Sequence, residues 1–474
     1  MSKSKRILFL DFMRVLALLM MIQGHTTYDF LDLSIRDGNS LGIQVWSSLR
    51  GYTAPFFMMV SGAVFCFLMI SQEQPDGSNP RVKAGTKRII TLLFWGYLLN
   101  FPIYVIGKIF TRDGLDRFLN IRVGETLITI FGIAVALFIY KSLQSDEEEA
   151  ANERAYIRHL FKRGGFNKDI ALKARLLNRR FLRNEEHKKR LFSSFFYSVL
   201  ISVPFLIISS LLSVEEKLRA LRVDVLHIIA LGLLTIMLVY FVSGKRRKLM
   251  ALIYFVLILL FVGIYPIVNN VDFSNLPIFL SSYLNNFETR SMFTITPWLS
   301  FIFAGALMGL WLAFEIKRDN FEKIIGFKLL GIGLVLLLLS YFGDKFEIYY
   351  YGRSYYWHDS PNLVYHRMGI VMCVGSFMAF LSLFIKDLPL FLKQMSRNTL
   401  WLYVGHLVII YQIVKPIIGY RTRFDVPIVL VFVITMYFLM YLQTRVIIYV
   451  QKNGGYTALF KKWVLRRKSK PADN

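Results

Sequence analysis

Long apolar stretches recur along the 474-residue chain and are separated by short polar connections. About twenty apolar helical residues cross the roughly 30 Å hydrocarbon core of a bilayer, so each stretch is long enough for a transmembrane helix. By this criterion the sequence predicts an all-α polytopic membrane helical bundle of about twelve spans. The spans run near residues 7–26, 53–72, 88–109, 125–143, 192–213, 222–243, 249–268, 295–315, 324–343, 364–385, 399–419 and 427–450.

Charge along the chain follows the same alternation. With a cytoplasmic N-terminus, the predicted cytoplasmic connections hold the basic clusters, as the positive-inside rule requires, and the C-terminus is cytoplasmic too. These clusters explain the formal net charge of +26, so we expect contacts with membrane lipids and none with nucleic acid. The hydrophobic content of 55%, together with the repeated apolar runs, excludes a soluble enzyme with a hydrophobic tail. The clusters occupy 81–88, 245–248, 317–323, 386–397 and 461–468.

We treat residues 1–474 as one transmembrane domain with two basic cytoplasmic additions. The loop insertion 144–191 is interpreted as a solvated helical hairpin near anionic headgroups, and a regulatory or partner-docking role is the alternative. The tail 452–474 is the second addition. Cys66 and Cys373 fall inside apolar runs, a pattern that indicates neither a metal site nor a disulfide framework.

Three ionisable residues, Asp11, Arg14 and His25, share one face of the first predicted span. The steps from Arg14 to His25 make about three helical turns, which places the two side chains within about 20° of each other and about 16 Å apart along the axis. Such a residue near mid-membrane costs roughly 2.5–3.5 kcal/mol on insertion scales, so it usually faces a bundle interior and marks function. The first helix is therefore the first candidate for a functional site.

The residue types in this stripe favour proton transfer and anion binding. His25, near the predicted outer rim, belongs to the residue type that exchanges a proton most readily at neutral pH. Arg14, about 12 Å deep by helical rise, is a fixed cation that suits a phosphate, carbonyl or carboxylate. Asp11 lies one turn below and can hold the guanidinium in place. A structural ion pair and an interfacial histidine are the alternatives.

Two segments resemble signatures of the acyltransferase-3 family of integral membrane acyltransferases. Arg14 and His25 match its Arg-x10-His spacing, and residues 56–62 are similar to its Phe-Phe-x-x-Ser-Gly element. The family's Arg-x-x-Arg element is incomplete, because Gly85 stands where the first arginine would be, before Lys87 and Arg88.

Two further segments resemble a related branch that includes heparan-alpha-glucosaminide N-acetyltransferase. Residues 296–299, followed by Gly305 and Gly309, are similar to that branch. Residues 396–406 resemble the closing Ser-Leu-x-x-Tyr-x-x-His motif that both branches share. The resemblance implies a core of about ten helices plus an extra pair of spans.

The resemblance also implies transfer of an acyl group from cytosolic acyl-CoA, acetyl-CoA first among the donors, to a carbohydrate acceptor on the far side. His25 would be the catalytic general base, with direct transfer and an acyl-histidine relay both open, and Arg14 would support the donor together with Asp11. No metal is expected. Candidate donor-binding residues are Arg14, Ser61, Lys83, Lys87 and Arg88. Ordinary positive-inside charge explains the basic residues of this group equally well.

Polar residues near the predicted outer ends of later spans are candidates for acceptor binding. Asp224 could orient His227 three residues later, although an interfacial hydrogen-bonded pair is the simpler interpretation. His406 is placed near mid-membrane, as a site residue or as a hydrogen bonder in the bundle interior. The full set of acceptor candidates is Asp224, His227, Trp298, His358, His366 and Arg367.

A proton-coupled secondary transporter of an anionic solute is the alternative function, because intramembrane Asp11, Arg14 and His25 also suit a proton relay. A non-catalytic assembly or polymer-export partner is a third. The proposed outer loops contain no N-x-[ST] sequon, which favours a bacterial plasma membrane. A homo-oligomer is compatible with all three functions.

Overall fold

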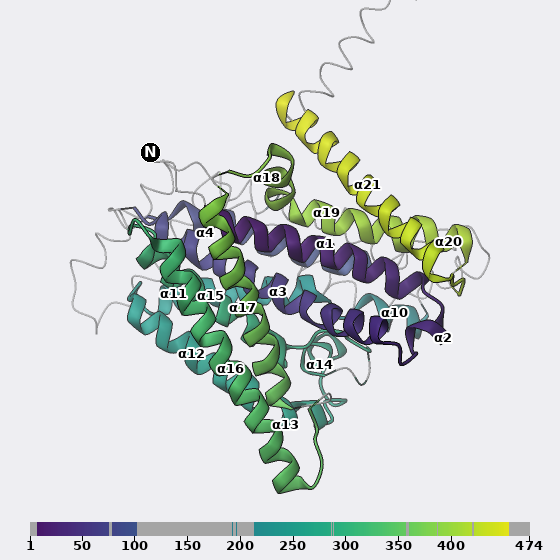
Figure 1. Ribbon diagram of the computed structural model, residues 1–474, viewed down its shortest axis with the longest axis horizontal. Helices are drawn as coiled ribbons and strands as arrows, with labels where there is room; N and C mark the ends of the chain where they lie inside the picture. Colours follow the sequence, from purple (N-terminus) through teal and green to yellow (C-terminus); the bar gives the residue numbers. More distant parts are fainter. Residues whose placement is uncertain are drawn as a thin grey trace, which may run out of the picture. The chain divides into compact units, whose positions relative to one another are not determined.

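The computed structural model describes residues 7–74, 78–101, 192, 196, 213–285, 287, 289–356, 360–385, 387–419 and 421–454. Regular structure in these residues is helical (Figure 1). One isolated bridge joins Leu31 to Phe424. The predicted span at 125–143, nearly all of the span at 192–213, the loop 144–191 and most of the tail lie outside the described residues.

Nine helical segments in the described part of the chain are long and apolar enough to cross a membrane, which confirms the predicted polytopic helical membrane protein. The total number of spans and the side of each terminus stay predictions. The nine segments are α1 (Leu8–Phe30), α3 (Leu41–Ser71), α11 (Val225–Val242), α12 with α13 (Arg247–Asn270), α15 (Ile295–Glu315), α16 (Phe321–Tyr351), α17 (Pro361–Phe384), α19 to α20 (Thr399–Ile418) and α21 (Val426–Lys452).

The chain divides into two compact units, residues 1–99 with 222–474 and residues 100–221. The second unit contributes α10 (Val214–Ala220), which begins with a capping box between Ser213 and Glu216. The remaining helices are α2 (Leu33–Arg36), α4 (Pro80–Asn100), α13 (Tyr265–Asn270), α14 (Ile278–Leu284), α18 (Leu390–Arg397), the π-helix η2 (Val408–Val414) and α20 (Lys415–Ile418).

α3 and α15, the two most buried of the nine segments, pack against each other. Glycines bring the two backbones together, since a Cβ on Gly305 would collide with the carbonyl of Met59, and a Cβ on Gly62 would collide with that of Ile302. In lipid there is no hydrophobic driving force for helix association, so helices associate through close packing. Small residues permit this close approach of the backbones. α1 packs against α3, α17, α18, α19 and α21, and is thereby held inside the bundle.

Apolar side chains of α12, α16 and α21 remain exposed. Only 17% to 28% of the most apolar window of these helices is buried, against 78% for α15. Surfaces of this kind are stable beside hydrocarbon and costly in water. These three helices therefore provide part of the lipid-facing surface in the described part of the chain.

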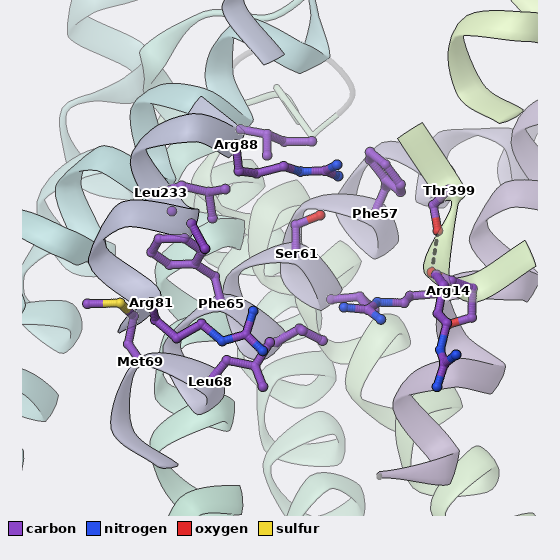
Figure 2. Close-up of a pocket in the computed structure, with 17 residues that line it drawn as sticks. Arg14, Phe57, Ser61, Phe65, Leu68, Met69, Arg81, Arg88, Leu233 and Thr399 are labelled. Carbon is purple, nitrogen blue, oxygen red and sulfur yellow. Dashed lines mark hydrogen bonds between the residues drawn. The ribbon is translucent and has the colours of Figure 1, made fainter. Parts of the chain in front are cut away.

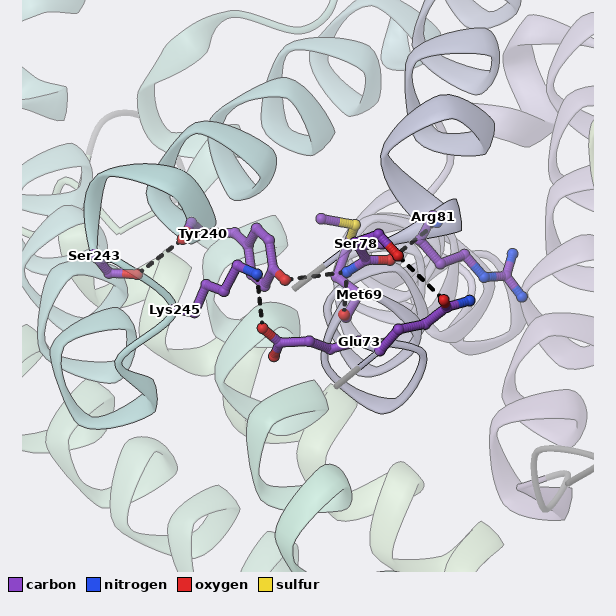
Figure 3. Close-up of polar contacts among 9 residues, drawn as sticks. Met69, Glu73, Ser78, Arg81, Tyr240, Ser243 and Lys245 are labelled. Atoms are coloured by element: carbon purple, nitrogen blue, oxygen red, sulfur yellow. Dashed lines mark hydrogen bonds and ion pairs between the residues drawn. The ribbon is translucent and has the colours of Figure 1, made fainter. Parts of the chain in front are cut away.

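Contacts between connections agree with the predicted alternation of sides. At one end, Lys245 after α11 forms an ion pair of 3.0 Å with Glu73 after α3, and Asn79 donates to the hydroxyl of Tyr240 at 3.2 Å (Figure 3). Both connections were predicted to be cytoplasmic. At the other end, the amide of Phe424 donates to the carbonyl of Phe30 at 2.7 Å, which joins two connections predicted to lie outside.

Candidate functional site

A cavity of about 290 Å³ lies at the end of the bundle where the predicted cytoplasmic connections meet. Arg14, Arg81 and Arg88 reach toward the space beside Ser61, as Figure 2 shows. A fourth arginine, Arg397, lines the same cavity. Apolar residues of α3 and α11, including Phe65 and Leu233, form the rest of the wall. We call this space the inner cavity.

α1 brings Arg14 to the inner cavity, and neighbouring polar groups hold it there. Asp11, only 4% exposed, lies 3.8 Å from the guanidinium of Arg14 and accepts a hydrogen bond of 2.5 Å from the hydroxyl of Ser396. The predicted i,i+3 pair is therefore present. Because Ser396 belongs to α18, the same carboxylate fixes α1 relative to the helix that carries Arg397.

α4 presents one face to the inner cavity. Arg81 and Arg88 are seven residues apart, which places them on the same side of a helix, and both line the cavity. Lys83 and Lys87 are exposed and are not among the lining residues. Gly85 lies on the cavity face, where a Cβ would come within 2.9 Å of the ring of Phe65. A larger side chain at this position would fill the space between α3 and α4.

Convergent arginines define what the inner cavity can bind. A guanidinium donates two parallel hydrogen bonds to a phosphate or carboxylate and remains charged at any physiological pH. Four such groups around a small, partly apolar space suit a ligand that combines several anionic groups with an uncharged arm. In the described part of the chain no group of three or more His, Cys, Asp or Glu is close enough to hold a metal ion.

His25 lies further along α1, in a second polar cluster that is built by α1, α19 (Thr399–Leu407) and the segment that follows α19. Its ring centroid is 5.5 Å from that of His406 and 6.4 Å from that of Tyr411. The hydroxyl of Tyr411 lies 3.5 Å from Nδ1 of His25 and donates to the carboxylate of Asp29. Lys415, which is 2% exposed, donates to the carbonyl of Asp29 at 2.7 Å.

The hydrogen bond from Tyr411 to Asp29 constrains the tautomer of His25. A phenol has one proton, and Tyr411 uses it in the hydrogen bond that it donates to the carboxylate of Asp29. The phenol oxygen can therefore only accept a hydrogen bond from Nδ1 of His25. This contact favours the form of the imidazole with hydrogen on Nδ1 and a lone pair on Nε2. His25 is thus prepared to take up a proton through Nε2.

Aromatic rings connect the inner cavity with His25. Phe57, a lining residue, stacks on Tyr403 at 6.0 Å between centroids, and Tyr403 lies 5.4 Å from His406. The side chain of Tyr403 also interacts with the carboxylate of Asp224. Arg14 and His25 therefore belong to separate sites, with the rings of Phe57, Tyr403 and His406 between them.

The other predicted acceptor residues fall in two places. Nδ1 of His227 accepts from the backbone amide of Asp224 at 3.0 Å, and its ring stacks edge-on against Tyr97 at 4.2 Å. The imidazole is thus oriented by the backbone at residue 224 and not by the carboxylate. His366 lies elsewhere and shares a hydrogen bond of 3.0 Å with Tyr52, while Arg367 lies 5.8 Å from the ring of Trp298. His358 lies outside the described residues.

Several residues of these clusters were not proposed from the sequence. Asp29 follows His25 by four residues, a helical spacing that places both on one face, so the sequence held a signal for it. Arg81 and Arg397 were interpreted as ordinary cytoplasmic charge. Tyr411 had no signal, because it lies inside η2, where the rotation from residue to residue differs from that of an α-helix.

The fold and the two clusters define a polytopic helical membrane protein with an arginine-lined cavity at one end and a buried histidine cluster beyond it. The family model of the heparan-alpha-glucosaminide N-acetyltransferase catalytic domain matches residues 6–118 and 170–340, more than half of the chain. The chain belongs to this family of membrane acetyltransferases. Membership of acyltransferase-3 stays a prediction. No curated protein and no solved structure matches the chain.

Proposed function

We propose that the protein transfers an acetyl group from cytosolic acetyl-CoA to an amine or hydroxyl of a carbohydrate on the opposite side of a bacterial plasma membrane. Enzymes of this family use acetyl-CoA as the donor. The observation that carries the proposal is the separation of two sites on α1, with Arg14 in the inner cavity and His25 about three turns away. An enzyme that joins substrates from two compartments needs such a separation.

The inner cavity suits the donor. CoA carries phosphates at one end and an uncharged pantetheine arm at the other. Arg81, Arg88 and Arg397 would bind the phosphates at the basic end, while the arm would follow the apolar residues of α3 toward Phe57. Arg14, fixed by Asp11, would bind the donor where the uncharged arm leaves the phosphates.

His25 would act where the two substrates meet. Its Nε2 takes the proton of the acceptor group as the oxygen or nitrogen of that group attacks the thioester carbonyl carbon. The carbon–sulfur bond then breaks, and the CoA thiolate leaves and is protonated. In the alternative relay, Nε2 attacks the thioester carbonyl carbon first, the carbon–sulfur bond breaks to release the CoA thiolate, and the acetyl-histidine then passes its acetyl group to the acceptor.

Proteoliposomes test the proposed sidedness. Radiolabelled acetyl-CoA is added outside vesicles that enclose glucosamine, and we expect labelled N-acetylglucosamine to accumulate in the lumen. Protein-free vesicles are the control. Label transfer only when both substrates share one compartment would contradict the proposal. Gradient-driven flux of an intact solute without acetyl transfer would support the transporter instead.

A pair of neighbouring basic residues tests the donor site. Arg88→Ala removes a guanidinium that lines the inner cavity, whereas Lys87→Ala removes a charge that lies about 100° away around α4 and outside the lining. A charge-assisted hydrogen bond contributes roughly 1.5–3 kcal/mol, so we expect the KM for acetyl-CoA to rise about tenfold or more in Arg88→Ala. Lys87→Ala should resemble the wild type. Equal effects of the two substitutions on KM would show that only general positive charge matters.

A further inference from the structure

A second cavity, of about 540 Å³, lies at the opposite end of the bundle from the inner cavity. α2, the first turns of α3 and the start of α17 form its walls. We call it the outer cavity. Its lining includes three arginines, Arg36, Arg50 and Arg367, together with the hydroxyl-bearing residues Ser47 and Tyr52.

The positive charge of the outer cavity is incompletely balanced by the protein. Arg36 forms an ion pair of 3.0 Å with Asp37, the one carboxylate among the lining residues that the structure describes. Arg50 lies over the rings of Tyr28 and Trp46, and Arg367 lies near Trp298. No carboxylate in the described part of the chain forms an ion pair with either of these two arginines.

The outer cavity adjoins the histidine cluster through Arg50. The Arg50 side chain packs on Gly24, since a Cβ on that glycine would lie 3.5 Å from Cγ of Arg50. Arg50 is also close enough to the neighbouring residue, His25, to interact with it electrostatically. Gly51 permits a similar approach of Arg367, because its Cβ position lies 3.7 Å from the guanidinium of Arg367. Arg50 of α3 thus lies beside His25, and Arg367 approaches α3 at the next residue, Gly51.

We propose that Arg50 and Arg367 bind an anionic group, a phosphate or a carboxylate, on the acceptor sugar. The inference rests on the proposed function, because it names the chemical class of the acceptor. A partly buried guanidinium without a carboxylate partner gains most from an anionic ligand. A sugar held by its anionic group in the outer cavity would direct its accepting amine or hydroxyl toward Nε2 of His25.

Binding without acetyl-CoA tests the inference separately from catalysis. The full-length protein in phosphatidylcholine nanodiscs is titrated calorimetrically with glucosamine 6-phosphate and with glucosamine. We expect the phosphorylated sugar to bind at least about tenfold more tightly, and Arg50→Gln and Arg367→Gln each to weaken it about tenfold. Arg353→Gln is the matched control, because Arg353 is exposed on the same predicted side and outside the cavity.

Two outcomes would overturn the inference. One is equal affinity for both sugars, or a preference that survives both substitutions. The other is loss of sugar phosphate binding when phosphatidylglycerol is added to the nanodiscs, which would identify a lipid headgroup as the occupant. A different result would contradict the proposed function: no acetyl transfer to either sugar, although the sugar phosphate still binds.

Discussion

His25→Ala is expected to lower the rate of acetyl transfer by about 10²–10⁴-fold, the contribution typical of a positioned general base. The loss should appear in kcat, because the inner cavity that binds the donor lies about three helical turns away. Acetyl-CoA binding should therefore be unchanged. Transfer of label from acetyl-CoA to glucosamine by purified protein measures the first quantity, and calorimetric titration with acetyl-CoA measures the second.

Gln23→Ala is the matched control for this experiment. Gln23 lies two residues before His25 on α1 and donates to the hydroxyl of Thr27 at 3.1 Å, outside the histidine cluster. Activity of Gln23→Ala close to the wild type shows that α1 tolerates the loss of a polar side chain at this level. Wild-type activity in His25→Ala would remove His25 from the mechanism.

Gly305→Ala is expected to have the largest effect on folding. The added Cβ would overlap the carbonyl of Met59, and neither backbone can move without separating α3 from α15. Overpacking of this kind costs about 1–3 kcal/mol or more. We expect a lower melting temperature in detergent and a smaller yield of monodisperse protein by size-exclusion chromatography.

Gly331→Ala tests whether the effect is specific to the helix contact. Gly331 lies within α16, and a Cβ there would meet no atom within 4 Å. Alanine favours a helix over glycine by about 1 kcal/mol, so this variant should melt at the wild-type temperature or above it. Equal melting temperatures for the two variants would contradict the proposed role of the α3–α15 contact.

The spans could be predicted from the sequence because hydropathy reports directly on the hydrocarbon core. The predicted span 295–315 coincides with α15 (Ile295–Glu315). α3 differs, since it begins at Leu41, well before the predicted start at residue 53. Its first turns contain exposed polar residues beyond the apolar stretch, and a hydropathy criterion detects only the part of a helix that lies in lipid.

Only those contacts of the candidate site that form between residues of a single helix could be predicted from the sequence. The Asp11–Arg14 pair follows from helical periodicity, and the structure contains it. Which of Lys83, Lys87 and Arg88 faces the inner cavity depends on the rotation of α4 about its own axis. That angle is set by packing against α3 and α11, which local sequence does not encode.

Because of the π-helix η2, the contacts of the histidine cluster depend on the number of residues in this segment. A π-helical turn holds one more residue than an α-helical turn, so it corresponds to a single-residue insertion in an α-helix. Removal of one residue between Val408 and Val414 would rotate everything downstream by about 100° and carry Lys415 away from Asp29. The contact between Lys415 and Asp29 therefore depends on the number of residues in this segment as well as on their types.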